Sequence, residues 1–196
     1  MDAGSVFTAP ELQRRYDEVG ISLFTHKVTL VPAQFLCRGG ERGMLSSVAE
    51  LSDGDAVMSA EVPEYAAVML WSPSPGEKLA GTLRDTVLRV DGSRAEILPE
   101  LYWMLRSLSG IPQYNKIVAS FDGSRLYLVI AEGKSLRLCN VFEAADFTTA
   151  EYWIFSAMKG LQLNPDVSDI FFRTPLTEDE EISLCSYFRS VENYWK

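Results

Sequence analysis

Histidine is almost missing from this sequence, which removes several kinds of site. His26 is the only histidine among 196 residues. A zinc site built on several histidines therefore cannot form. A catalytic pair of His26 with Cys37 has no supporting signature, and an ordinary residue at a strand edge explains His26 better. The sequence thus predicts no metal site.

Cysteine is also scarce, and the three that occur are far apart. Cys37, Cys139 and Cys185 form no Cys-x-x-Cys pair, and their number is odd. Widely spaced, unpaired cysteines are typical of reduced proteins rather than of disulfide-linked secreted ones. Residues 1–10 also lack the basic start and apolar run of a signal peptide. We therefore expect buried free thiols and a cytoplasmic location.

Long apolar runs and clusters of positive charge are both absent. No stretch approaches the roughly 20 apolar residues that span a bilayer, so we expect no membrane association. The net charge is -9, and no run of Lys or Arg interrupts it. Nucleic-acid binding requires a cationic surface, so nucleic acid is not an expected partner. Hydrophobic residues make up 47% of the chain, enough for a folded core.

Catalytic motifs are missing as well. No Gly-x-Ser-x-Gly elbow occurs. Gly76-Glu77-Lys78 lacks the remaining residues of a P-loop, and the glycines of 39–43 do not fit the dinucleotide-binding fingerprint. The sequence therefore predicts no catalytic residues and no cofactor, and it favours a protein that is not an enzyme.

The first part of the chain, residues 1–112, mixes short helices with a small antiparallel sheet. A capping box at Thr8-Ala9-Pro10-Glu11 predicts a helix to about Val19. The predicted boundary to the second part is Ile111-Pro112-Gln113. Apolar runs and turn residues predict strands at 21–24, 27–31, 44–49, 57–62, 65–71 and 86–90, and helices at 77–83 and 94–108.

The second part, residues 113–196, has the clearest pattern. Two short glycine-containing links join three strands, which marks consecutive hairpins. Capping boxes at Thr148–Glu151 and Thr177–Glu180 each predict a helix. The predicted strands are 116–121, 125–131, 135–142 and 169–172. The resulting order, three strands, helix, strand, helix, is that of a ribonuclease-H-like half, the unit duplicated in actin-like ATPases.

Two stretches carry a resemblance to a known family. One is Thr29-Leu30-Val31-Pro32 followed by Phe35. The other runs through 136–142 and Phe147-Thr148-Thr149-Ala150-Glu151-Tyr152-Trp153 to Leu163-Asn164-Pro165. In these stretches the sequence resembles a bacterial family of uncharacterised proteins, domain of unknown function 3822.

The resemblance implies an α/β, two-lobed, actin-like fold with no established activity. Relatives begin with strands that precede the helix expected here at about Ala9 to Val19. The resemblance therefore implies an incomplete N-terminal half, 1–112, and a complete ribonuclease-H-like C-terminal half, 113–196. In ATP-binding actin-like proteins the opening hairpin holds phosphate, so its absence argues against nucleotide binding.

The turn Asp122-Gly123-Ser124 is the one candidate ligand site. It stands where actin-like ATPases place a phosphate-binding loop, and its N–H groups and the Ser124 hydroxyl are suitable donors. Asp-Gly is also the commonest pair in tight hairpin turns, and that interpretation is favoured. Phe172 and Arg173 would fill the adenosine position. Asp122, Glu151 and Asp169 form the only plausible carboxylate set for a two-metal nuclease, a weaker hypothesis.

Two functions remain open at this point. The favoured one is a non-catalytic binding or scaffold protein with a degenerate actin-like fold. The alternative is a nucleotide-binding actin-like ATPase that uses Asp122, Gly123 and Ser124. Because an incomplete sheet exposes unpaired backbone groups, we also expect a protein partner or self-association.

Overall fold

The structure is a computed structural model that describes residues 5–37, 39–74 and 76–194. Its contacts divide the chain into two compact units, Met1–Glu100 (unit 1) and Leu101–Lys196 (unit 2). The boundary between them comes earlier in the chain than the one predicted at residues 111–113. None of the helices in the described ranges has the length and hydrophobicity needed to cross a membrane.

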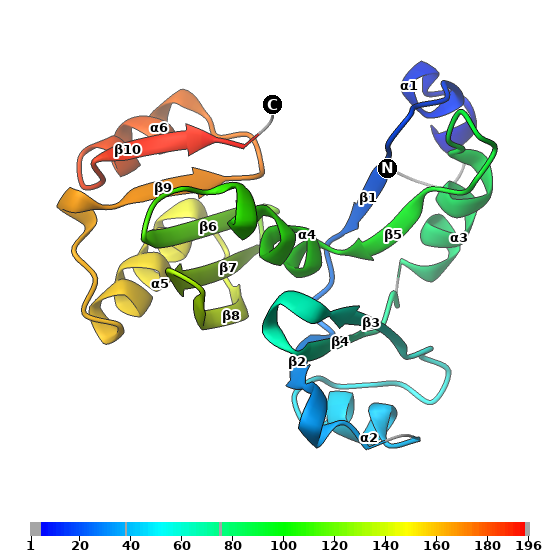
Figure 1. Ribbon diagram of the computed structural model, residues 1–196. Helices are drawn as coiled ribbons and strands as arrows, with labels where there is room; N and C mark the ends of the chain where they lie inside the picture. The colour runs from blue at the N-terminus through cyan, green and yellow to red at the C-terminus, as the bar shows by residue number, and fades with distance from the viewer. Residues whose placement is uncertain (1–4, 38, 75, 195–196) are drawn as a thin grey trace. The chain divides into compact units, whose positions relative to one another are not determined.

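Unit 1 contains two small sheets (Figure 1). In the first, β1 (Gly20–Leu23) pairs in parallel with β5 (Glu96–Pro99). In the second, β4 (Ala67–Trp71) lies between β2 (Val28–Pro32) and β3 (Met58–Val62), and both pairings are antiparallel. All five residues of β4 are buried, so this central strand forms the core of the second sheet.

The helices of unit 1 are short. The α-helices are α1 (Pro10–Gln13), α2 (Glu41–Ser46) and α3 (Glu77–Thr86). Single 3-10 turns occupy Ser5–Phe7, Ala33–Phe35 and Pro63–Tyr65.

Several predictions for unit 1 were wrong. The first helix ends at Gln13 instead of Val19, and Ala9 caps it without a side-chain hydrogen bond. No residue of this helix is buried, so no packing extends it. The first half of the run 44–49 belongs to helix α2 and the rest forms a turn, because a short apolar run does not distinguish a strand from a helix.

Two further differences occur near the end of unit 1. Helix α3 continues to Thr86, and beyond it only isolated bridges form at Leu88 and Arg89, in place of the strand predicted at 86–90. The helix predicted at 94–108 divides into strand β5 and helix α4 (Glu100–Ser107), since the residue before Pro99 is restricted to extended backbone.

Unit 2 is a five-stranded sheet in the order β10-β9-β6-β7-β8. The pairs β6–β7 and β7–β8 are antiparallel, whereas β6–β9 and β9–β10 are parallel. The strands are β6 (Asn115–Phe121), β7 (Arg125–Glu132), β8 (Ser135–Glu143), β9 (Asp169–Phe172) and β10 (Ser190–Asn193).

Helices α5 (Phe147–Gly160) and α6 (Glu178–Cys185) pack against one face of this sheet. A turn of 3-10 helix, Leu108–Gly110, follows α4, and another, Pro165–Val167, follows α5. Alternate residues of the strands meet the helices in one apolar core, in which Ile154, Phe172 and Leu184 are fully buried. The strand, strand, strand, helix, strand, helix order predicted from the sequence is present, with β10 as an additional strand.

Two details of unit 2 differ from prediction. Helix α5 is capped by Asp146, whose side chain accepts from the Thr149 N–H, so Thr148–Glu151 is not its capping box. The predicted capping box of α6 is present, with Thr177 and Glu180 bonded reciprocally. The three cysteines are free, but none is fully buried as expected: Cys37 and Cys185 are exposed and Cys139 is half-buried.

Candidate functional site

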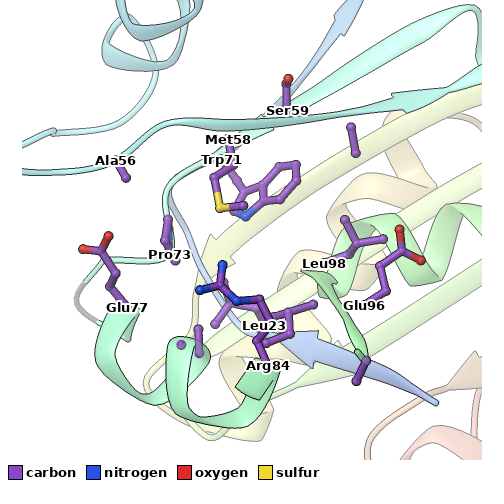
Figure 2. A pocket seen from close by; sticks show the side chains of 15 residues that line it. Leu23, Ala56, Met58, Ser59, Trp71, Pro73, Glu77, Arg84, Glu96 and Leu98 are labelled. Carbon is purple, nitrogen blue, oxygen red and sulfur yellow. The ribbon is translucent and has the colours of Figure 1, made fainter. Parts of the chain in front are cut away.

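A cavity of about 430 Å³ lies in unit 1 (Figure 2). Its walls come from β1, β3, β4, α3 and β5. Apolar side chains dominate the lining, among them Leu23, Met58, Trp71, Pro73 and Leu98. The volume falls in the range of small-molecule sites, which are typically apolar with a few polar groups.

Small residues on helix α3 leave room for the cavity. Ala80 and Gly81 line it, and a Cβ built on Gly81 would meet no atom within 4 Å. Glycine in a helix interior destabilises the helix by roughly 1 kcal/mol relative to alanine. Gly81 therefore lowers the stability of helix α3 at a position that lines the cavity.

Trp71 is the one aromatic residue in the described lining of the cavity. Only 2% of its surface is exposed, and it ends the buried strand β4. Within the residues that the structure describes, its indole Nε1–H donates to no acceptor. An indole N–H is a donor only, and this nitrogen is not among the buried side-chain atoms without a partner in the described part of the chain. The cavity is thus bordered by an unused donor.

Three charged side chains also line the cavity. Arg84 lies near the C-terminal end of α3, and Glu77 is the first residue of the same helix. Glu96 is the first residue of β5 (Figure 2). The one ion pair formed by Arg84 in the described ranges is a long contact of 3.8 Å with Asp85. The Arg84 side chain is 54% exposed, so its remaining guanidinium donors are open both to solvent and to a molecule in the cavity.

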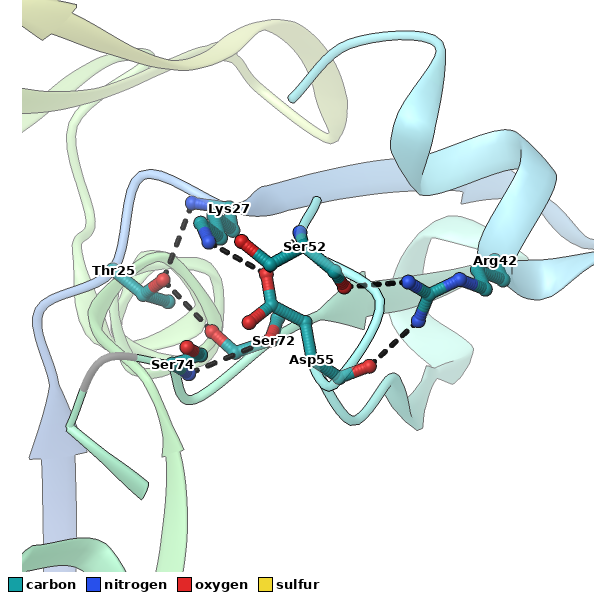
Figure 3. Close-up of polar contacts among 7 residues, drawn as sticks. All are labelled: Thr25, Lys27, Arg42, Ser52, Asp55, Ser72 and Ser74. Carbon is teal, nitrogen blue, oxygen red and sulfur yellow. Dashed lines mark hydrogen bonds and ion pairs between the residues drawn. The ribbon is translucent and has the colours of Figure 1, made fainter. Parts of the chain in front are cut away.

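A polar cluster holds the loop before β3 next to this cavity. Lys27 Nζ lies 2.6 Å from Asp55 Oδ2, and the two side chains are 12% and 5% exposed. Arg42 donates to the backbone oxygens of Ser52 and Asp55, at 2.6 and 2.7 Å. Figure 3 shows Lys27 and Arg42 reaching this loop from opposite sides. Because Ala56 follows Asp55 and lines the cavity, the cluster fixes part of the wall.

The same cluster controls the ionisation of Asp55. The hydrogen bond from Lys27 makes the largest contribution to lowering the pKa of this carboxyl well below its ordinary value, and bonds from Ser74 and Ser52 add to it. The carboxylate therefore stays charged in its buried position. Nothing in this cluster suggests a reaction, and we interpret it as structural.

The turn Asp122-Gly123-Ser124 joins β6 to β7 in unit 2. Asp122 Oδ1 accepts from the Ser124 N–H and hydroxyl, both at 2.9 Å, and from the Arg125 N–H at 2.7 Å. Gly123 has a φ of +92°, which favours glycine. The donors that a phosphate would need are thus already bonded to the Asp122 carboxylate.

The carboxylates considered for a nuclease are engaged separately. Asp169 is 4% exposed and bonds to the Arg189 guanidinium at 2.7 and 2.5 Å, and this pairing is the main cause of its lowered pKa. Glu151 lies within α5, and its Oε1 is buried without a hydrogen-bond partner in the described part of the chain. No group of three or more His, Cys, Asp or Glu side chains that could hold a metal occurs in the ranges that the structure describes.

Sequence analysis identified the Asp122 turn but not the cavity of unit 1. Its apolar lining comes from five segments between residues 23 and 98, and each segment by itself has the pattern of an ordinary core. The one sequence feature that could have indicated the cavity was Gly81 within a helical pattern. A glycine inside a helix destabilises it, which suggests a packing or functional reason for the glycine.

Comparison with known proteins places these features in a family and a fold. A crystal structure from Bacteroides thetaiotaomicron VPI-5482, of a protein with an actin-like ATPase fold and unknown function, matches with a TM-score of 0.71. The match has 16% identity and covers 97% of this chain and 74% of that chain. At this identity the similarity concerns the fold alone, which is α/β and similar to that of actin-like ATPases.

A chain from the PilM–PilN type IV pilus biogenesis complex matches with a TM-score of 0.47 and 14% identity, over 85% of this chain and 64% of that chain. Comparison with curated proteins found no match. The family model described as protein of unknown function (DUF3822) matches residues 4–191, and the chain therefore belongs to this family.

Proposed function

We propose that this protein is a non-catalytic binding protein that has an actin-like fold but does not bind nucleotide at the Asp122 turn. The observation that carries the proposal is the hydrogen bonding of Asp122 itself. Its Oδ1 already accepts from the Ser124 N–H, the Ser124 hydroxyl and the Arg125 N–H. A phosphate would have to displace a carboxylate from these donors and then remain beside its negative charge.

The environment of β9 supports the same proposal. Phe172 is fully buried in the core of unit 2, and the Arg173 N–H bonds to the Ala119 carbonyl at 2.9 Å. A purine needs open space and close approach of backbone at the end of this strand. A buried phenylalanine leaves no such space at its own position.

The proposal includes a complete ribonuclease-H-like half in unit 2 and an incomplete one in unit 1. In unit 2, β9 is followed by α6 and the parallel strand β10, and β6 pairs with the other edge of β9. In unit 1, β1 leads through the three-stranded sheet and α3 to the parallel strand β5. By this correspondence β1 and β5 match β9 and β10, and the described part of unit 1 has no counterpart of β6, β7 and β8.

A protein partner or a second copy of the chain belongs to the proposal too. The sheet of β1 and β5 has two strands, and a two-stranded sheet is at the lower limit of stability in water. Strands from a partner would stabilise it. Size-exclusion chromatography with light scattering tests self-association: a monomer mass at all concentrations would exclude it and leave only a different protein as partner.

Thermal unfolding with and without nucleotide tests the absence of nucleotide binding. A ligand that binds the folded state raises the melting temperature by mass action. We expect the same melting temperature with and without millimolar ATP and Mg²⁺, for the natural protein and for Asp122→Ala. A rise in the natural protein that disappears in Asp122→Ala would support the ATPase alternative instead.

A further inference from the structure

We propose that the cavity of unit 1 binds a small apolar molecule that carries a carbonyl or carboxylate oxygen, with this oxygen accepting hydrogen bonds from Trp71 and Arg84. The inference deepens the proposed binding function and rests on it. It also predicts a ligand for a part of the chain that is separate from the Asp122 turn.

The indole of Trp71 is the first observation that carries this inference. The residue is 2% exposed, lines the cavity, and donates its Nε1–H to no described residue. Its Nε1 is not one of the buried side-chain atoms that lack a partner among the described residues, so the N–H is open to the cavity. An acceptor atom within the cavity can therefore bond to it. The ligand should therefore present an oxygen to the indole.

Arg84 is the second observation. It lines the same cavity, and the only ion pair it makes in the described ranges is the 3.8 Å contact with Asp85. In Figure 2 the indole nitrogen of Trp71 lies on the side of the ring toward the Arg84 guanidinium. A carbonyl or carboxylate oxygen can accept from both donors.

The remaining lining sets the other properties of the ligand. Leu23, Met58 and Leu98 provide an apolar wall, and the volume of about 430 Å³ admits a molecule larger than a single side chain. Glu77 and Glu96 also line the cavity, and both are exposed acceptors that cannot donate a hydrogen bond to a carbonyl or carboxylate oxygen. Their negative charge favours a neutral carbonyl, whereas Arg84 favours a carboxylate.

Calorimetric titration with three eight-carbon probes tests the inference. Octanamide has a neutral carbonyl, octanoate has a carboxylate, and octylamine has the same chain with no acceptor at neutral pH. We expect saturable binding of the first two, about three- to tenfold tighter than any binding of octylamine, the range of one or two hydrogen bonds. The tighter of the two acceptor probes identifies the head group. Failure of both to bind, or equal or tighter binding of octylamine, would overturn the inference.

Matched variants test whether the probes occupy this cavity. Trp71→Phe keeps an aromatic ring but removes the donor, and we expect it to weaken both acceptor probes by about three- to tenfold. Arg84→Gln should weaken octanoate more than octanamide. Unchanged affinity in both variants would show that neither donor holds the ligand.

Substitutions at Gly81 provide a test that does not alter the proposed donors. Gly81→Leu should fill the cavity and abolish probe binding, whereas Gly81→Ala, with open space around its Cβ, should retain it. Binding retained in Gly81→Leu would overturn the inference. These titrations contain no nucleotide, so their failure is distinguishable from ATP binding, which would instead contradict the proposed function.

Discussion

The contacts that hold the loop before β3 depend on the ionised carboxylate of Asp55. It is buried, and the hydrogen bond from Lys27 lowers its pKa below the ordinary value of 3.8. A carboxyl whose pKa is lower in the folded state stabilises the fold above its unfolded pKa, and this contribution is lost as the pH falls toward the folded value. Its stabilisation is therefore fully present at neutral pH and decreases below about pH 4.

Asp55→Asn should lower the melting temperature at pH 7, and the difference from the natural protein should shrink as the pH falls from about 5 to 3. Circular dichroism melts at several pH values measure this. Asp53→Asn, at an exposed neighbour in the same loop, is the control and should change little. A difference that stays constant down to pH 3 would contradict the assignment.

The three cysteines differ in environment, and this predicts different reactivity. Burial raises the pKa of the Cys139 thiol to about 12, whereas Cys37 and Cys185 are exposed. Since the thiolate is the reactive form, we expect iodoacetamide to modify Cys37 and Cys185 at least about tenfold faster than Cys139 in the folded protein. Peptide mass spectrometry gives the rates, and unfolding in urea should remove the difference. Equal rates in the folded state would contradict it.

At the scale of elements, helix α3 contains a glycine, Gly81, that lowers its stability and faces open space. Gly81→Ala should stabilise the protein by up to about 1 kcal/mol, because alanine favours the helix and its Cβ has space. Gly123→Ala should have the opposite sign, since its φ of +92° strains any side chain. Urea unfolding measures both. Destabilisation by Gly81→Ala would mean that the space next to α3 is occupied.

The start of helix α6 provides a second test at this scale. Thr177 Oγ1 accepts from the Glu180 N–H, and the Glu180 carboxylate accepts from the Thr177 N–H at 2.8 Å. Thr177→Ala should lower the free energy of unfolding by about 0.5–2 kcal/mol, and Thr177→Ser should retain most of the stability. If the two variants lose the same amount, the hydroxyl is not the stabilising group.

Unit 2 was predictable because its local signals agree with its packing. The two turns that join strands β6, β7 and β8 contain Gly123 and Gly133, and both glycines have a positive φ. The box at Thr177 marks α6 directly. The strand β10 was missed because it has four residues, half of them exposed, and only its pairing with β9 makes it a strand.

Unit 1 was less predictable because its elements are short and depend on tertiary contacts. Strand β5 has four residues and was predicted as part of a helix. Its apolar residues directly precede the helical pattern of α4, so the two segments look continuous in the sequence. The cavity combines five such elements, so no single segment contains its pattern. Neither the unused donor of Trp71 nor the long contact of Arg84 can be recognised before the fold is known.

At the scale of the whole molecule, family and fold are clearer than activity. The family model covers residues 4–191, and the fold is similar to that of actin-like ATPases. The fold of an enzyme class does not by itself carry its chemistry, which depends on particular side chains. In this chain the Asp122 turn is bonded internally, and the donors proposed here for a ligand, Trp71 and Arg84, line the cavity of unit 1.

Calorimetric titration with ATP and Mg²⁺, with ADP as a control, tests most directly whether this protein, whose fold is similar to that of actin-like ATPases, lacks nucleotide binding at the Asp122 turn. We predict no saturable heat at millimolar nucleotide, because the donors of the Asp122 turn are satisfied within the protein. Stoichiometric, saturable binding that is lost in Asp122→Ala would contradict this account.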